Sequence, residues 1–536
     1  MLGKIEQGAI VISGQPTATF IQALPHLEGR RRWQARKFVC EFTKHNHTIL
    51  DQAGVEWLED VPEPPRLEFT SDYKSLTDDF PHQVRAKAKA RGRAVMALFM
   101  EQGTGKTKVA IDLAGELHCA GKLTGVLVVS KKGVHRQWIE GEIPKHCGCP
   151  WQGAYWTGKP ELVDWSGQGL QWYAINYDAL KFDGGYEAAM RFARAHHATG
   201  LLVVGDESQE VKDESSARAK AFAKLKPFST FRLITTGTPI AKDLTDEWSQ
   251  LKWLDENIIG IRYKTAFRRR YCIMGGFQNR AVVGHVNVEQ FKALTAPHVF
   301  RATKEEIGIL PKVYNEWHFD MTQEQMRHLR EMKKELETMI ERNLITAAHA
   351  ATRIIKMQQI RSGFAVDEND ALVHIMPLDR NPVIQAAHEW LEAGEGKAIV
   401  WFRFREEGRM LMQALDRYER VDYHGGTNDK QRAANIASFM HPRGAQLLIA
   451  NEAASTGLNL QGLCRRNLYF ANGFNAISRW QSEDRTHRIG TTDYVTFTDL
   501  IGNRTFDRYI LANLRKKKSL SSMVLDDVRT MLGEIT

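Results

Sequence analysis

The run Gly103-Thr104-Gly105-Lys106-Thr107 has the residue types of a phosphate-binding loop. It follows an apolar segment, 95–100, and precedes a stretch of helical composition, 108–117. Glycines allow backbone N–H groups to curl around an anion, and the first turn of a helix directs its positive end toward the same anion. Lys106 is then expected to reach the β- and γ-phosphates of a nucleoside triphosphate, and the Thr107 hydroxyl to bind Mg²⁺.

An acidic pair supplies the second half of such a site, which is needed because the complete motif G-x-x-x-x-G-K-[ST] has glycine where this chain has Met100. Asp206 and Glu207 follow the apolar run 201–204, at the strand end where α/β sheets bind their ligands. We expect Asp206 to hold Mg²⁺, directly or through water, and Glu207 to orient the attacking water. The alternative is a solvated acidic turn. Thr236-Gly237-Thr238-Pro239 ends the next apolar run, and unless it is an ordinary turn its hydroxyls are expected to bond to the acidic pair.

Two arginines near the carboxyl end, Arg485 and Arg488, lie three residues apart and would share one face of a helix. A guanidinium held over the γ-phosphate stabilises the charge of the transition state, and its removal costs on the order of 10³–10⁵ in rate. If a second lobe supplies these arginines, hydrolysis requires the lobes to close. Closure would couple ATP to movement.

The sequence predicts two α/β units to carry these groups. Short β-branched runs alternate with stretches of helical composition, which indicates buried parallel sheets. The strands expected in the first unit include 126–130, 201–205 and 231–236. Those of the second are 398–402, 447–450, 467–470 and 494–500. Between the two units, residues 321–364 are rich in Glu, Lys, Gln, Met and Leu, which favours long helices. Two such units suggest a cleft.

The chain is too long for one hydrophobic core, so several domains are expected from its 536 residues. A proline-rich segment, 60–65, marks the first boundary. The predicted domains are an N-terminal accessory domain at 1–65, for which DNA recognition is a candidate role, a first α/β domain at 66–310, a helical linker at 311–380, a second α/β domain at 381–502, and a C-terminal helix at 503–536.

Composition points to a globular protein that associates with a polyanion. The formal net charge is +9 and the pI is near 9.1, which favours nucleic acid through counterion release, although charge of this size also serves solubility. No apolar run approaches the roughly 20 residues of a membrane-spanning helix, and the first residues lack a signal-peptide pattern. We therefore expect no membrane association. The six cysteines give no disulfide framework.

The motifs and their order resemble the Swi/Snf-type ATPases of helicase superfamily two across most of residues 75–530. The resemblance implies an α/β fold with two tandem RecA-like domains, in which parallel sheets are flanked by helices, with a short helical insertion and a small N-terminal accessory domain. It also implies ATP and Mg²⁺ as cofactors. The family's phosphate loop itself lacks the first glycine, so Met100 is no longer an objection.

The resemblance assigns roles to individual residues. The catalytic residues would be Lys106, Asp206, Glu207, Gln209, Arg485 and Arg488. ATP would be bound by Gln83, which reads the adenine, and by Gly103, Thr104, Gly105, Lys106, Thr107, Gly457 and Gln481. Mg²⁺ would be held by Thr107 and Asp206. The DNA contacts would be His135, Arg136, Gln137, Trp138, Tyr177, His424, Ser455, Thr456 and Asn459.

The chain departs from the family pattern at identifiable positions. The acidic motif ends in Gln209 where the family has histidine, which puts the coupling of hydrolysis to movement in doubt. The last position of the sixth motif is Thr491 instead of glutamine. Residues 505–520 are similar to a helix that braces the first lobe. Segment 10–39 resembles the accessory domain of annealing-helicase relatives, and an unrelated packing domain is the alternative.

These observations lead to one leading function and two alternatives. The leading function is an ATP-dependent translocase that tracks along duplex or branched DNA and remodels forks, joints or protein–DNA complexes. We expect a compact, monomeric prokaryotic or phage motor in the cytoplasm, or in the nucleus of a eukaryote, that works with replication, recombination or transcription proteins. The alternatives are an ATPase directed to RNA or associated with RNA polymerase, and a clamp that binds nucleotide without hydrolysing it.

Overall fold

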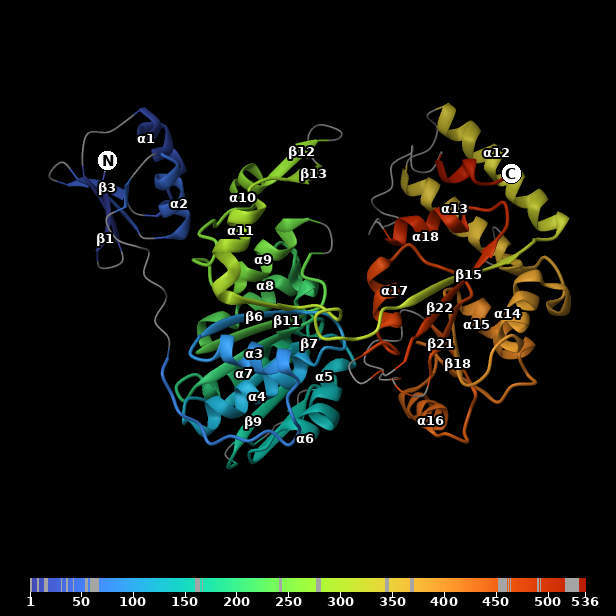
Figure 1. Ribbon diagram of the computed structural model, residues 1–536, viewed down its shortest axis with the longest axis horizontal. Coiled ribbons are helices and arrows are strands. Elements are labelled where there is room, and N and C mark those ends of the chain that lie inside the picture. The colour runs from blue at the N-terminus through green and yellow to red at the C-terminus, as the bar shows by residue number, and fades with distance from the viewer. Residues whose placement is uncertain are drawn as a thin grey trace. The chain divides into compact units, whose positions relative to one another are not determined.

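The structure is a computed structural model of the chain. It describes residues 2–536 except 7–8, 14–17, 30, 35–36, 42, 54–55, 58–66, 160–163, 166, 241–242, 276–280, 343–346, 367–370, 452–459, 461, 463, 489–490, 492 and 516–529. The chain divides into two compact units (Figure 1). The first comprises Met1–Glu101 and Gly105–Thr303, and the second comprises Lys304–Thr536 together with Gln102–Thr104.

The first unit is built on a seven-stranded sheet in the order β14-β6-β11-β10-β7-β9-β8, in which all neighbouring strands are parallel. Its strands are β6 (Val95–Met100), β7 (Gly125–Ser130), β8 (Trp151–Tyr155), β9 (Leu170–Asn176), β10 (Leu201–Asp206), β11 (Phe231–Thr236) and β14 (Val299–Ala302). The predicted parallel sheet is confirmed.

Both faces of this sheet are covered, which explains why its central strands are continuous apolar runs. Along β6, alternate residues enter different cores: Val95, Ala97 and Phe99 pack on one face, whereas Met96 and Leu98 pack on the other. The helices of this unit are α3 (Pro81–Ala90), α4 (Lys106–Cys119), α5 (Val134–Gln137), α6 (Ile143–His146), α7 (Asp183–His196), α8 (Ala217–Ala223), α9 (Leu244–Leu254), α10 (Lys264–Tyr271) and α11 (Val288–Thr295). A hairpin of β12 (Cys272–Gly275) and β13 (Ala281–His285) follows α10.

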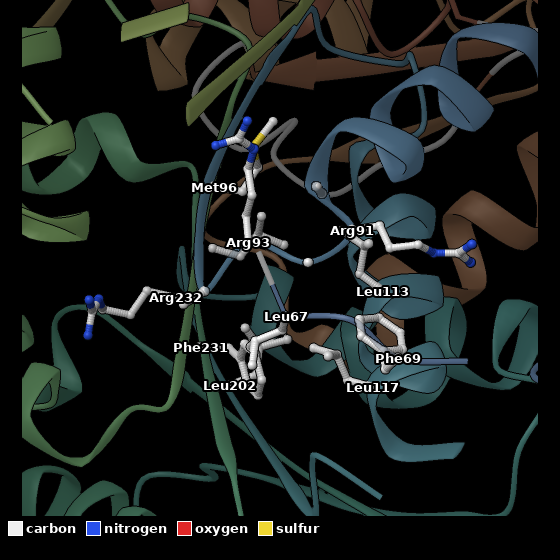
Figure 2. Close-up of a pocket in the computed structure, with 14 residues that line it drawn as sticks. Leu67, Phe69, Arg91, Arg93, Met96, Leu113, Leu117, Leu202, Phe231 and Arg232 are labelled. Carbon is white, nitrogen blue, oxygen red and sulfur yellow. The ribbon is translucent and has the colours of Figure 1, made fainter. Parts of the chain in front are cut away.

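The segment that leads into α3 is fastened at the amino-terminal edge of this sheet. Leu67 and Phe69 gather there with Leu117, Leu202 and Phe231 (Figure 2). The cavity among these side chains has a volume of about 30 Å³, enough for a water molecule but not for a nucleotide. Ligands of open α/β sheets bind at the opposite edge, outside the carboxyl ends of the strands.

The second unit holds a six-stranded parallel sheet in the order β15-β22-β21-β18-β20-β19. Its strands are β15 (Val313–Phe319), β18 (Ala398–Phe402), β19 (Arg420–Tyr423), β20 (Leu447–Asn451), β21 (Arg466–Tyr469) and β22 (Thr496–Gly502). Its helices are α12 (Gln323–Glu341), α13 (Ala347–Arg361), α14 (Pro382–Glu392), α15 (Arg405–Ala414), α16 (Asp429–Met440), α17 (Ala476–Glu483) and α18 (Asp507–Arg515). A small hairpin of β16 (Phe364–Val366) and β17 (Leu372–His374) follows α13.

One part of the second unit differs from its sequence-based description, and a second is described only in part. The stretch 311–380 was expected to be helical, and α12 and α13 lie there, but it also contains β15, an edge strand parallel to β22. The described part of the tail contributes α18 to the core of the second unit, and the predicted bracing of the first unit stays a prediction, since residues 516–529 lie outside the described residues. Ile510 and Leu514 share one face of α18 and join the same apolar cluster as β22.

A small domain precedes the first sheet. Its five strands have the order β3-β4-β2-β1-β5, largely antiparallel, and they are β1 (Leu2–Glu6), β2 (Ala9–Ser13), β3 (Arg31–Gln34), β4 (Lys37–Glu41) and β5 (Glu56–Trp57). Helices α1 (Ala18–Ala23) and α2 (Lys44–Gln52) accompany them. Ile10, Ile12, Phe20, Phe38 and Leu50 form a core of their own. Within the described residues, no helix has both the length and the apolar character needed to span a membrane.

Candidate active site

The phosphate loop joins β6 to α4 and takes a conformation that only glycine adopts easily. Gly103 has φ +77° and Gly105 has φ +83°, both in the left-handed region. A side chain at Gly105 would also displace the Gln83 amide, because a Cβ there would lie 2.1 Å from Nε2 of Gln83. Helix α4 begins at the next residue, Lys106, so the N–H groups of its first turn lie beside the loop. Thr107 stands in this first turn with a partly exposed side chain.

The ammonium group of Lys106 is held inside this loop by the loop's own carbonyls. Its Nζ donates to the carbonyl oxygen of Met100 at 2.9 Å and to that of Glu101 at 3.2 Å, and the residue is buried. A nucleotide phosphate would add the attraction of opposite charges to the hydrogen bonds of this buried ammonium group. This is the environment that a nucleotide phosphate would complete.

Gln83, predicted to read the adenine, lies against the phosphate loop. Its Nε2 donates to the carbonyl oxygen of Gly105 at 3.5 Å, and its Oε1 accepts from the backbone N–H of Phe80 at 2.9 Å. It stands in the first turn of α3, where Pro81 begins the helix. The base-reading and phosphate-binding segments, 22 residues apart in the chain, are thus brought together.

Asp206 is the last residue of β10 and is buried at the carboxyl-terminal edge of the sheet. Its Oδ2 accepts from the indole N–H of Trp138 at 3.0 Å, and its Oδ1 accepts from the hydroxyl of Thr235 at 2.6 Å. Burial and then the charge of Glu207 raise the pKa of Asp206, while these hydrogen bonds and the charge of Lys106 oppose the rise. A carboxylate that is costly to ionise here would be relieved by a divalent cation.

The donor chemistry of this edge fits Mg²⁺. The Asp206 carboxylate and the Thr107 hydroxyl are hard oxygen donors, and Mg²⁺ commonly takes only one or two protein oxygens and completes its shell with water and phosphate. Among the residues that the structure describes, no cluster of three or more His, Cys, Asp or Glu side chains could hold a metal by itself.

Glu207 is fixed by a relay that runs to the end of the neighbouring strand β11. Its backbone has φ +53°, which is unfavourable for a residue with a side chain and is typical of functional sites. Gln209 Nε2 donates to Glu207 Oε2 at 2.8 Å, and Gln209 Oε1 accepts from the hydroxyl of Thr236 at 2.5 Å. The backbone N–H of Thr238 donates to the same Thr236 hydroxyl at 3.0 Å. Gln209 therefore bridges the acidic motif and the threonine motif with both ends of its amide.

The threonine motif was expected to bond directly to the acidic pair, and the structure modifies this. Thr236 reaches Glu207 only through Gln209, whereas the direct hydroxyl donor to Asp206 is Thr235, which the motif did not include. The parallel register explains the difference, since Asp206 lies opposite Thr235. Thr235 and Trp138 are the site residues that sequence reasoning missed or misassigned.

Three predicted DNA contacts of the first unit are corrected, because their side chains lie in the interior. Trp138 is 1% exposed and serves Asp206, and Tyr177 is 2% exposed beneath the same edge. His135 is 7% exposed; its Nδ1 accepts from the N–H of Gly133 at 3.2 Å, so its Nε2–H donates to the carbonyl of Trp156 at 3.1 Å. Burial is the main reason that the pKa of His135 is lowered, so it is neutral near pH 7.

The other predicted DNA contacts differ in accessibility. Arg136 is exposed and pairs with Glu140 at 2.6 Å, and Gln137 is partly exposed. In the second unit, His424 is partly exposed and lies 3.0 Å from Asp422. The remaining predicted residues of the second unit's nucleotide and DNA segments, Ser455, Thr456, Gly457 and Asn459, lie outside the described residues.

The two arginines do not share a helix face, since α17 ends at Glu483 and they follow it in a turn. Arg485 Nε donates to the carbonyl oxygen of Gln481 at 2.8 Å, and Arg488 Nε donates to that of Asp484 at 2.8 Å. Each guanidinium is thus oriented by the backbone carbonyl of the residue four positions earlier. Gln481, predicted to bind ATP, accepts the hydrogen bond from Arg485 with its backbone carbonyl oxygen.

The chain's sequence matches two known domains in succession. Residues 82–366, more than half of the chain, match the SNF2-related domain, and residues 382–490 match the helicase conserved C-terminal domain. The chain belongs to the SNF2-related family. Together with the two parallel sheets, this confirms the resemblance to Swi/Snf-type ATPases of helicase superfamily two, and it places the chain in a class of ATP-dependent enzymes.

Curated relatives of this SNF2-related chain are distant and longer. It is 25% identical over 332 residues to an uncharacterized ATP-dependent helicase of Mycoplasma genitalium, a match that covers 60% of this chain and 30% of that protein. It is 24% identical over 460 residues to a probable chromatin-remodeling complex ATPase chain of rice, covering 80% and 39%. It is 23% identical over 347 residues to the mouse DNA annealing helicase and endonuclease ZRANB3, covering 61% and 30%. The chain thus spans about a third of the length of these relatives.

A solved structure is also similar. The SWI2/SNF2 ATPase core of Sulfolobus solfataricus in complex with dsDNA is 21% identical, and the match covers 88% of this chain and 99% of that one with a TM-score of 0.38.

Proposed function

We propose that this SNF2-related chain is a DNA-stimulated ATPase that translocates along duplex or branched DNA. The observation that carries the proposal is the edge of the first sheet where β6, β10 and β11 end together. There the phosphate loop, the acidic pair and the threonine motif meet, with Lys106 close enough to Asp206 for its charge to act on that carboxyl. These are the groups that in-line phosphoryl transfer to water requires.

The residues divide the chemistry between them. Lys106 exchanges its carbonyl partners for the β- and γ-phosphates of ATP, and Gln83 selects the adenine. Asp206 and Thr107 would hold Mg²⁺, which when bound neutralises charge that builds on the phosphate oxygens. Glu207 orients the attacking water and accepts its proton, and Gln209 keeps the Glu207 carboxylate in place. Because Gln209 also bonds Thr236, a change at the γ-phosphate is passed to the threonine motif.

The arginine-bearing turn of the second unit would complete this site. Arg485 and Arg488 supply the positive charge that the transition state needs, a contribution worth on the order of 10³–10⁵ in rate. Since they belong to the second unit and Lys106 to the first, hydrolysis would require the two units to come together, and this alternation is the stroke that moves DNA.

DNA is proposed as the track because of the net charge of +9 and the family. The names of the relatives support it, since one is a DNA annealing helicase and another an ATPase of a chromatin-remodeling complex. Fork or joint remodelling is the finer part of the proposal. An RNA-directed or RNA-polymerase-associated motor is the alternative, and the nucleic acid that stimulates turnover separates the two.

The test is ATP turnover by the full chain, alone and with duplex, forked, four-way or single-stranded DNA or with RNA, at one stated salt concentration because polyanion binding depends steeply on salt. We expect duplex or branched DNA to give the largest stimulation. Equal turnover with and without every DNA would reject the proposal, and preferential stimulation by RNA would favour the alternative.

Lys106→Ala should abolish turnover while the protein stays folded, since the phosphates lose their buried cation. Lys122→Ala is the matched control because Lys122 is exposed and lies in the turn before β7, at the opposite edge of the sheet. Retained hydrolysis in Lys106→Ala, measured in the same assay, would show that the loop is not the catalytic phosphate site.

A further inference from the structure

A buried group of opposite charges surrounds the arginine-bearing turn of the second unit. Its cations are Lys304, Lys312 and Arg479, and its carboxylates are Glu483, Asp484 and Asp499. We name these six residues the turn clamp. Three positive and three negative charges balance, so the group is stable in the interior only while all its members stay paired.

The first two cations come from the segment by which the chain enters the second unit. Lys304 is the first residue of that unit, and Lys312 directly precedes β15. Lys304 Nζ donates to Asp484 Oδ1 at 2.7 Å and to the carbonyl oxygen of His487 at 2.6 Å. Lys312 Nζ donates to the same Asp484 oxygen at 2.8 Å and to Glu483 Oε2 at 2.8 Å. The entering segment is therefore bonded to the turn by both its ends.

His487 strengthens this attachment and fixes its own tautomer. Its Nε2 lies 2.6 Å from the carbonyl oxygen of Leu310, which can only accept, so Nε2 carries the hydrogen. Its Nδ1 is then free to accept from Lys304 at 3.2 Å. Burial, followed by the charge of Lys304, lowers the pKa of His487 to about 4, which agrees with a neutral ring.

The clamp reaches one arginine more directly than the other. Arg488 Nε donates to the backbone carbonyl of Asp484, the residue whose side chain both lysines hold. Arg485 Nε donates instead to the carbonyl of Gln481, which lies within α17. A movement of the lysines thus changes the position of Arg488 through Asp484, whereas Arg485 keeps the support of the helix.

We propose that Lys304 and Lys312 are positioning residues for Arg488, so that the segment entering the second unit and the arginine-bearing turn move as one body. This inference rests on the proposed function and adds a regulation to it. Because Thr303 ends the first unit, any nucleotide-driven displacement of that unit pulls on Lys304 along the chain. Because Lys304 is bonded to Asp484, and Asp484 to Arg488, such a displacement would move the Arg488 guanidinium.

The experiment is a double-mutant cycle on the full chain, with kcat and KM for ATP measured in saturating duplex DNA. Lys304→Met removes the charge and keeps most of the volume, and we expect kcat to fall about 10- to 100-fold, as a displacement of about 1 Å at a catalytic group does. KM should change less than about twofold, since the phosphate loop is intact. In an Arg488→Ala background, Lys304→Met should lower kcat by less than about threefold. In an Arg485→Ala background, it should lower kcat as much as it does in the wild type.

Two further variants separate positioning from simple stability. Lys312→Arg keeps the charge and should retain most of the kcat that Lys312→Met loses. Arg465→Gln is the matched control, because Arg465 forms a half-exposed pair with Asp493 in the same unit at 2.5 Å, and its kcat should not change. Equal costs of Lys304→Met in all three backgrounds, or an unchanged kcat, would overturn the inference. Hydrolysis retained by Lys106→Ala would instead overturn the proposed function.

Discussion

Each unit contains a buried charge network beside a nucleotide-site element, and the two networks differ in what they connect. In the first unit, Lys108 Nζ donates to Asp79 and Asp112, each at 2.6 Å, and Lys87 bonds to both carboxylates as well. These residues tie the segment before α3 to α3 and α4, behind the phosphate loop. In the second unit, the turn clamp lies next to Arg488 and includes the entering segment.

The difference separates two uses of buried charge. The network of the first unit joins α3, α4 and the segment before them, and within the described part of the chain its ion pairs reach no residue proposed to touch ATP, so it should serve stability. The turn clamp includes Asp484, whose backbone carbonyl orients Arg488, so it should serve turnover. A buried ion pair is often no better than apolar packing, but breaking one partner is costly in either case.

The largest effect expected from this comparison is on stability, in the first unit. Asp112→Ala leaves Lys87 and Lys108 with one carboxylate between them, and it should lower the free energy of unfolding by about 3–5 kcal/mol. Urea unfolding measures this loss. The control Glu289→Gln removes an exposed pair with Lys292 and should change stability by less than about 0.5 kcal/mol. The comparison breaks if Asp112→Ala reduces turnover per folded molecule as strongly as Lys304→Met does.

The relay at Glu207 gives the next effect, on turnover alone. Gln209→Ala removes the amide that joins Glu207 to Thr236, and a hydrogen bond to a charged group is worth about 1.5–3 kcal/mol. We expect DNA-stimulated kcat to fall about 10- to 100-fold while stability changes little. Gln209→Glu is the informative comparison, because it keeps the size but places a like charge beside Glu207. If Gln209→Ala keeps the full DNA stimulation of kcat, the hydrogen bonds of Gln209 to Glu207 and Thr236 do not link hydrolysis to DNA.

The smallest expected effect is on the free energy of unfolding at acidic pH. Burial tends to raise the pKa of Glu483, but the charges of Lys312 and Arg479 outweigh it and hold this pKa below its usual 4.5. The pKa of Asp484 is likewise lowered, by Lys312 and Lys304, against the effect of its burial. Carboxylates with lowered pKa values contribute stability above their unfolded pKa, and this is lost as pH falls through the folded one. The free energy of unfolding should therefore decline as pH drops below about 4.5. Glu483→Gln should flatten this decline by at most about 1.4 kcal/mol per pH unit, and an unchanged slope would show that Glu483 keeps its ordinary pKa.

The sequence was sufficient for features carried by contiguous residues. The central strands are uninterrupted apolar runs, and the phosphate loop and acidic pair each lie within a few residues, so their placement at strand ends followed directly. The edge strand β15 was missed because its exposed residues, such as Asn315 and Glu316, interrupt any apolar pattern.

Contacts between distant residues could not be inferred from spacing. Trp138 and Asp206 are 68 positions apart, and Lys304 and Asp484 are 180 apart, so neither pairing leaves a local signal. Trp138 was placed on DNA by its position in a motif, whereas its indole needed a buried acceptor. Likewise, the parallel register of β10 and β11, which selects Thr235 as the partner of Asp206, is a property of the folded sheet.

The most direct test of the account is single-turnover hydrolysis of γ-labelled ATP by Arg485→Ala in the presence of duplex DNA, with binding of a fluorescent ATP analogue measured on the same preparation. If groups from both units act on one triphosphate, binding should stay within about threefold of the wild type while the hydrolysis step slows by about 10³–10⁵. Hydrolysis at the wild-type rate would contradict it, because the first unit would then suffice without the arginine of the second.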